Sequence, residues 1–172
     1  MGVPIRRRTR ARELALQMLY ALELRGAEAM EELDAFVEHH TKRGPDPKGQ
    51  NEVAGYARKL VTGTFEHRGD LNDWIEHIAE NWRLERMAHI DRNVLRLAVY
   101  ELLYETDVPF KVVINEAIDI AKRFSTSQSG SFVNGILDRA RILIEEGRAR
   151  GEGVPRPPAA PAPRAAAANA AA

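Results

Sequence analysis

The stretch from Asp91 to Tyr104 constrains the fold of this chain more than any other, because it is apolar on nearly every side of a helix. Its apolar residues recur at the three- and four-residue spacing of an α-helix, and only Arg96 and Glu101 interrupt them. A helix of this kind must be surrounded by others to keep its surface out of water. We therefore expect an all-α domain built around it, with Asp91 as the N-cap and residues 107–109 as the stop signal.

Apolar residues follow a helical period along the rest of the chain as well, and no useful length alternates with the period of two that marks a strand. The pattern predicts further helices at about residues 14–25, 28–40, 52–65, 71–78, 112–124 and 132–144. Two prolines and two glycines interrupt it between residues 43 and 49. Asp70 suits the N-cap of the helix that follows it. Together with the central helix, about seven helices are expected.

The composition changes after Gly147 to arginine, glycine, proline and alanine. Residues 155–172 contain no aromatic or large aliphatic side chain, so they cannot bury enough surface to offset the entropy of ordering them. We expect residues 1–147 to form one helical domain and residues 148–172 to form a disordered, low-complexity tail.

Charge and cysteine content narrow the possible functions. The 25 basic and 25 acidic residues cancel, so any preference for nucleic acid must come from local clustering. Without cysteine there is no disulfide, thiolate metal site or cysteine nucleophile, and no histidine spacing suits a metal. No Gly-rich phosphate loop or isolated pair of carboxylates suggests catalysis. We expect a cytoplasmic protein that is not an enzyme, needs no cofactor and has no membrane span.

Five arginines gather at the N-terminus before the first acidic residue, Glu13. They are Arg6, Arg7, Arg8, Arg10 and Arg12. The N-terminus of a helix already carries a positive partial charge, so arginines are unfavourable there unless an anion binds. Because guanidinium groups bind phosphates and stack on exposed bases, the cluster suggests single-stranded RNA. A merely solvated basic terminus is the alternative.

Asn134 and Gly135 stand inside the last helical pattern, where glycine costs about 1 kcal/mol relative to alanine. Either another backbone packs closely here, which is the favoured interpretation, or a partner approaches. Ser125, Ser127 and Ser129 precede the same helix. Their default role is to cap it, and the alternative is a small phosphate seat formed with the free amides of the first turn.

Four aromatic residues lie on the apolar stripes of the predicted helices. They are Tyr56, Phe65, Trp74 and Trp82. On these stripes an aromatic side chain is more often part of the core than a platform for bases, so we expect all four in the core.

Four motifs in this chain resemble the NusB transcription antitermination family, in the order in which they occur there. They are residues 10–20, 91–104, 107–118 and 132–138, within a resemblance that covers about residues 6–146. The resemblance implies a compact bundle of two helical subdomains. It also implies that the protein binds the boxA element of nascent RNA together with the small-subunit ribosomal protein NusE. RNA polymerase then reads through terminators, chiefly in ribosomal RNA operons.

The resemblance also implies functional residues. With Arg6 from the basic cluster, the expected RNA-binding residues are Arg7, Arg8, Arg10, Arg12, Gln17, Tyr20, Gln128, Ser129 and Phe132. Tyr20 and Asp91 match positions of the surface that binds the partner protein. Thr9 interrupts the arginine run, and Ser131 stands where relatives often have a basic residue, which weakens the expectation of a phosphate contact there.

Our hypothesis is a non-catalytic RNA-binding adaptor in an RNA polymerase antitermination complex. An enzyme is the first rival, because a similar helical domain is fused to some RNA cytosine methyltransferases, but the residues after Gly147 cannot form the nucleotide-binding domain that those enzymes need. The second rival is a helical protein-binding module, or a homodimer that hides the arginines and binds no RNA.

Overall fold

The computed structural model describes residues 5–42, 45–80 and 82–158. Within these ranges it contains seven α-helices, two short 3-10 helices and no strand, so the all-α prediction is confirmed. The α-helices are α1 (Ile5–Arg25), α2 (Leu33–Thr41), α3 (Pro47–Glu66), α4 (Arg68–Ile78), α5 (His89–Tyr104), α6 (Phe110–Phe124) and α7 (Ser129–Ala149), and the 3-10 helices are η1 (Ala27–Glu32) and η2 (Leu84–Arg86).

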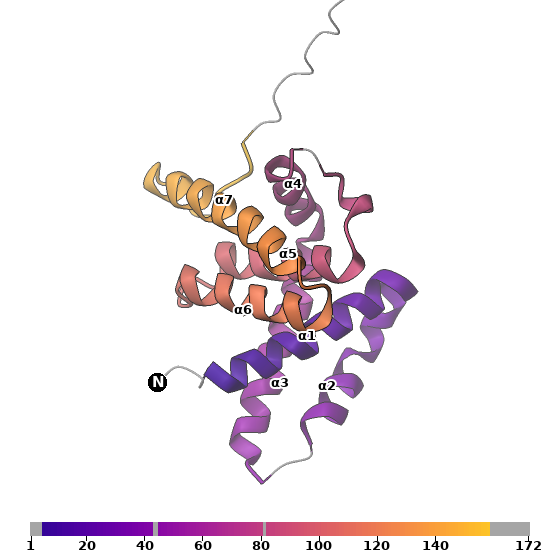
Figure 1. The fold of residues 1–172 in the computed structure, drawn as a ribbon. Coiled ribbons are helices and arrows are strands. Elements are labelled where there is room, and N and C mark those ends of the chain that lie inside the picture. The colour runs from indigo at the N-terminus through magenta and orange to yellow at the C-terminus, as the bar shows by residue number, and fades with distance from the viewer. Residues whose placement is uncertain (1–4, 43–44, 81, 159–172) are drawn as a thin grey trace, which may run out of the picture.

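The helix α5 is the centre of the fold, and α1, α3, α4, α6 and α7 all pack against it (Figure 1). Leu95 and Val99 are fully buried, as a helix apolar on most sides requires. Glu101, which interrupts the apolar pattern in the sequence, is nevertheless buried, with a side chain that is only 1% exposed. The predicted N-cap is also wrong, since Ala88 holds that position and Asp91 lies in the first turn.

Two groups of helices meet at α5, in agreement with a bundle of two subdomains. The first consists of α1, α2 and α3, and the second of α4, α5, α6 and α7 (Figure 1). Because α1 and α3 also pack on α5, the groups share one continuous hydrophobic core.

Local capping explains where the helices depart from the sequence pattern. The helix α3 begins at Pro47, five residues before the predicted start, because the Asp46 carboxylate accepts a hydrogen bond from the backbone of Gly49. The pattern at 28–40 divides into η1 and α2. Asp70 does not cap α4, which begins two residues earlier with His67 as N-cap.

The segment that was expected to be disordered, residues 148–172, begins inside α7, which extends to Ala149. Gly151 has a φ of 86°, a conformation that favours glycine, and this turn leads the chain back along the end of α7. Pro155 is buried next to Gly147. Residues 159–172 lie outside the described residues.

Candidate nucleic-acid interface

The helix α1 divides the arginine cluster between its two faces. Arg6 and Arg10 are exposed, whereas the Arg12 side chain is only 2% exposed and points at α5. There its Nε and Nη2 atoms donate to the two carboxylate oxygens of Glu101 at 2.7 and 2.8 Å. Glu116 of α6 lies 3.5 Å from the same guanidinium group. Arg12 therefore joins α1 to the core of the bundle and is not at the surface.

Tyr56 of α3 completes this buried site. Its hydroxyl donates to Glu101 at 2.9 Å, and the guanidinium carbon of Arg8 lies 5.0 Å from the centre of its ring. Burial alone would lower the pKa of Arg12, but the hydrogen bonds and charge of Glu101 outweigh this effect and raise it. Burial and the same carboxylate raise the pKa of Tyr56. Arg12 therefore stays charged and Tyr56 stays neutral at neutral pH.

Three other arginines also have carboxylate partners. Arg7 binds Asp46 at 2.6 Å and pairs with Glu52, both at the start of α3. Arg8 binds Asp107 at 3.1 Å, and Arg10 lies 3.4 Å from Glu13. Although no acidic residue precedes Glu13 in the sequence, the fold gives Arg7, Arg8, Arg10 and Arg12 each a carboxylate partner.

The exposed face of α1 carries the predicted residues that do reach the surface. Arg6, Arg10, Gln17 and Tyr20 recur on one side of the helix at intervals of three to seven residues. Tyr20 is half-buried, with its ring edge-on to His89 at 6.2 Å between centroids. This face offers two guanidinium groups, an amide and an aromatic edge, which suit phosphates and bases.

The C-terminal end of α6 extends this face with two residues that the sequence analysis missed. The Arg123 guanidinium pairs with Glu13 of α1 and is 56% exposed. Phe124 is exposed and lines a shallow groove of about 80 Å³ with Gln17 and Tyr20. The signal available in the sequence was a basic pair followed by an aromatic residue at the end of an amphipathic helix.

The start of α7 continues the surface beyond α6. Gln128 is exposed, and Phe132 lies one turn later and is half-buried. Ser129 is buried, and its hydroxyl donates to Asp91 at 3.1 Å. The bond ties the start of α7 to the start of α5, so neither side chain is available to RNA in this conformation.

The capping interpretation of the three serines is wrong. Gln128 occupies the N-cap of α7, and no side chain caps that helix. The Ser129 hydroxyl instead accepts from the backbone of Thr126 at 3.2 Å.

The core prediction for the aromatic residues is correct for Tyr56 and Trp74, which are buried, and wrong for Trp82, which is 54% exposed. Phe65 is half-buried. Trp82 contacts Phe132 at 5.9 Å between ring centroids, with the rings inclined at 66°. The reason for the error is that Trp82 lies after α4 has ended, in the segment that leads to η2, where helical periodicity does not apply.

The favoured interpretation of Gly135 is also wrong. A Cβ atom built at this residue would have no heavy atom within 4 Å, so no described backbone packs there. The alternative, a partner that approaches this point, stays a prediction. The close helix packing occurs elsewhere, at Gly63, where a Cβ would lie 2.1 Å from the Tyr100 ring.

We call the resulting surface the α1–α7 strip. It consists of Arg6, Arg10, Gln17, Tyr20, Arg123, Phe124, Gln128 and Phe132. The ion pair between Arg123 and Glu13 and the groove beside Phe124 join the α1 and α6 parts of this strip. Its chemistry is cationic and aromatic, which is the combination that single-stranded RNA requires.

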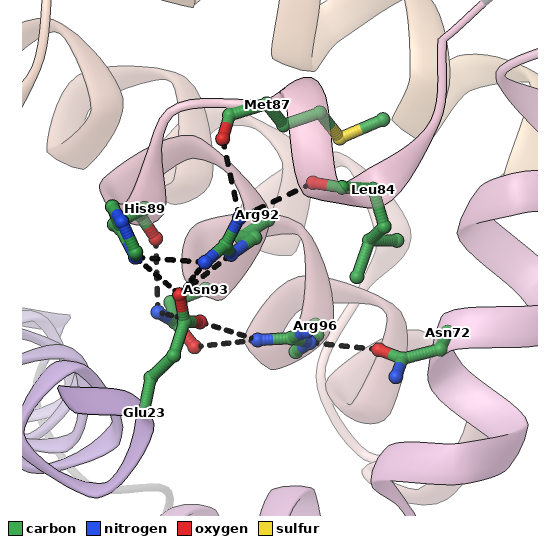
Figure 2. Close-up of polar contacts among 8 residues, drawn as sticks. All are labelled: Glu23, Asn72, Leu84, Met87, His89, Arg92, Asn93 and Arg96. Carbon is green, nitrogen blue, oxygen red and sulfur yellow. Dashed lines mark hydrogen bonds and ion pairs between the residues drawn. The ribbon is translucent and has the colours of Figure 1, made fainter. Parts of the chain in front are cut away.

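A second polar cluster lies behind this surface, where the end of α1 meets α5 (Figure 2). Glu23 accepts hydrogen bonds from Asn93 at 2.9 Å and Arg96 at 2.7 Å, and it also pairs with Arg92 and His89. Burial would raise the pKa of Glu23, but these donors dominate and lower it to about 2. The sequence analysis missed this residue, which looks like one more carboxylate on a solvated helix face.

No three His, Cys, Asp or Glu side chains converge into a metal site within the described residues. None of the described helices is both long enough and apolar enough to cross a membrane.

Comparison with known proteins places the chain in a family. A model of the NusB family matches residues 9–141. The transcription antitermination protein NusB of Myxococcus xanthus is 46% identical over 143 residues, which cover 81% of this chain and 97% of the relative. The corresponding protein of Anaeromyxobacter dehalogenans strain 2CP-1 is 49% identical over 146 residues, covering 85% and 97%.

Solved structures agree. Thermotoga maritima NusB has a TM-score of 0.68 and 39% identity, covering 83% of this chain and 93% of that one. A chain from a crystal structure of the antitermination factors NusB and NusE with double-stranded RNA has a TM-score of 0.68 and 28% identity, covering 80% and 97%. With the same seven-helix fold and this similarity over most of its length, the chain belongs to the NusB family.

Proposed function

We propose that this protein is a transcription antitermination factor that binds boxA-type RNA of nascent ribosomal RNA transcripts. It acts with the ribosomal protein NusE in an RNA polymerase antitermination complex. The observation that carries the proposal is family membership, combined with a fold like that of a NusB solved with NusE and RNA. The exposed cations and aromatic residues of the α1–α7 strip support the RNA-binding part.

The structure narrows the residues proposed to contact RNA. Arg6 and Arg10 are exposed on the strip and are assigned to phosphates, with Arg123 beside them. Arg7 and Arg8 hold carboxylates of α3 and of the turn before α6, so they position α1. Arg12 is assigned a structural role because it is buried against Glu101. Gln17, Tyr20, Gln128 and Phe132 are assigned to bases and sugars.

NusE is proposed to bind beside Tyr20, on the surface formed by the ends of α1 and the start of α5. Asp91 supports that surface from within through its bond to Ser129. Because binding free energies are coupled reciprocally, NusE that raises the RNA affinity must itself bind more tightly when RNA is present.

The test compares Arg10→Ala with Arg58→Ala. Both arginines pair with one carboxylate, Arg10 with Glu13 and Arg58 with Asp34, but only Arg10 lies on the strip. Fluorescence anisotropy with a boxA oligonucleotide and a scrambled one of equal length, with and without NusE, gives the affinities across salt concentrations.

We expect the native protein to prefer boxA RNA and Arg58→Ala to behave like it. Loss of the Arg10 phosphate contact should weaken binding to both oligonucleotides and reduce the slope of log affinity against log salt by about 0.7. Equal affinities of the native protein for boxA and scrambled RNA, even with NusE present, would contradict the proposal.

A further inference from the structure

Trp82 is the aromatic side chain that the fold leaves most open. More than half of it is exposed, whereas the only other tryptophan, Trp74, is buried. Large aromatic side chains dominate cores and interfaces because of the area that they bury. An exposed tryptophan that touches a residue of the α1–α7 strip therefore indicates a contact surface.

Arg92 of α5 binds the backbone shortly after Trp82. Leu84 and Met87 are buried, and their carbonyl oxygens accept hydrogen bonds from Arg92 at 3.3 and 3.4 Å (Figure 2). Glu23 in turn pairs with Arg92. The backbone of Trp82 donates to Ala79 at 2.8 Å. The backbone at Trp82, Leu84 and Met87 is thus tied to the end of α4 and to α5, which lowers the entropy cost of binding to the ring.

On the other side of Trp82, α7 presents Phe132 and then Gly135. The two aromatic rings meet edge to face, and Gly135 lies almost one turn further along the helix, near the side that carries Phe132. Glycine in a helix interior costs about 1 kcal/mol, and no described residue packs against this one. Because Trp82 meets Phe132 edge to face and is 54% exposed, it leaves ring surface on which a planar base can stack.

The arginines near Trp82 differ from Arg8 and Arg12 of α1 in their partners. Arg83 and Arg86 are exposed, and neither has a carboxylate within 4.0 Å in the part of the chain that the structure describes. Unpaired guanidinium groups next to an aromatic surface favour a nucleic-acid strand over an apolar protein partner, because phosphates can neutralise them.

We propose that Trp82 and Phe132, with the bare backbone of Gly135 beside them, form a stacking site for an unpaired base of the bound RNA. Arg83 and Arg86 contact the phosphates on either side of this base. The inference rests on the proposed function and deepens it: the strand follows the α1–α7 strip past α7 and ends on the segment between α4 and α5.

The test is the affinity of Trp82→Ala and Trp82→Phe for boxA RNA, alone and with NusE. Alanine should weaken binding about 5-fold to 100-fold, whereas phenylalanine should keep most of the affinity, because stacking needs a flat ring. The salt dependence should stay unchanged, unlike that of Arg10→Ala. Ile142→Ala is the matched control, since it removes an exposed apolar side chain of α7 outside the strip.

Shortened oligonucleotides locate the contact. Removing nucleotides from one end of the RNA should abolish the difference between Trp82→Ala and the native protein, and removing them from the other end should not. Tryptophan emission of the native protein should be quenched by RNA, and that of Trp82→Phe should not, because the remaining Trp74 is buried.

Two outcomes would overturn the stacking site while the proposed function stands. One is native-like RNA affinity of Trp82→Ala. The other is weaker binding of Trp82→Ala to NusE in the absence of RNA, by a factor that accounts for its whole loss of RNA affinity. If the native protein fails to bind boxA RNA in the same assay, both the function and the site are refuted.

Discussion

Arg12 shows how one residue can carry the sequence signature of a ligand contact and serve the core instead. It belongs to the arginine cluster of α1, yet its guanidinium is bound by two hydrogen bonds to Glu101. Glu101 in turn accepts from Tyr56. A buried charge is tolerated only when paired and hydrogen-bonded, so the three residues depend on one another.

Replacing Arg12 alone should therefore be costly. Arg12→Met leaves the Glu101 carboxylate buried without its partner, and we expect a loss of about 3–5 kcal/mol in the free energy of unfolding. The triple variant Arg12→Met, Tyr56→Phe, Glu101→Leu should recover most of this loss, because apolar groups replace the pair and no buried hydroxyl is left without its acceptor. Urea unfolding measures both. A single variant as stable as the native protein would show that the pair is not buried.

The contrast with the surface is a further prediction at this scale. Arg10→Ala breaks a long, partly exposed contact with Glu13, so the free energy of unfolding should change by less than about 1 kcal/mol. Its effect should appear in RNA affinity, which separates the binding role of Arg10 from the structural role of Arg12. Loss of stability comparable to that of Arg12→Met would contradict this separation.

At the scale of elements, the two faces of a helix explain why neighbouring residues differ so much. Residues of α1 four positions apart share a face, so Arg8 and Arg12 turn to Tyr56 while Arg6 and Arg10 turn to solvent. The same argument holds for the glycines of α3 and α7. The sequence places both Gly63 and Gly135 in helix interiors. Whether a side chain would fit at each position depends on the element that packs against it.

Gly63 and Gly135 form a matched pair for this point. Gly63→Ala should destabilise the protein by about 1–3 kcal/mol, because its Cβ would lie 2.1 Å from the Tyr100 ring. Gly135→Ala should stabilise it by about 0.5–1 kcal/mol, since the added methyl group meets open space and favours the helix. Unfolding in urea gives both values, and the reverse order would mean that α3 and α5 are not in close contact.

At the scale of the whole molecule, Glu23 joins the two groups of helices. It extends from α1 to Arg92 and Arg96 of α5, and Arg96 also reaches Asn72 of α4 at 2.8 Å (Figure 2). The single carboxylate of Glu23 faces two guanidinium groups, so the cluster keeps an excess positive charge. Glu23 must be ionised to hold Arg92 and Arg96 together.

This arrangement predicts a pH dependence. The pKa of Glu23 is lowered to about 2 in the folded protein, so its contribution is complete above its unfolded value of about 4.5 and is lost as the pH falls towards 2. The fall in pKa from 4.5 to about 2 corresponds to about 3.4 kcal/mol, and solvent screening of this partly exposed cluster lowers the contribution to about 2–3 kcal/mol. In Glu23→Gln the free energy of unfolding should be lower at neutral pH, and the difference from the native protein should shrink between pH 4.5 and 2. A constant difference across this range would contradict the prediction.

The sequence by itself determined the helical class, the central position of α5 and the family resemblance, because these follow from local periodicity and from short motifs. It could not determine the pairing of Arg12 with Glu101, the exposure of Trp82, the open space at Gly135 or the junction at Glu23. Each of these depends on which residue from a distant element arrives at the same point. A carboxylate 89 positions away in the chain turns an arginine from a surface cation into part of the core, and only the packing of α1 on α5 brings the two together.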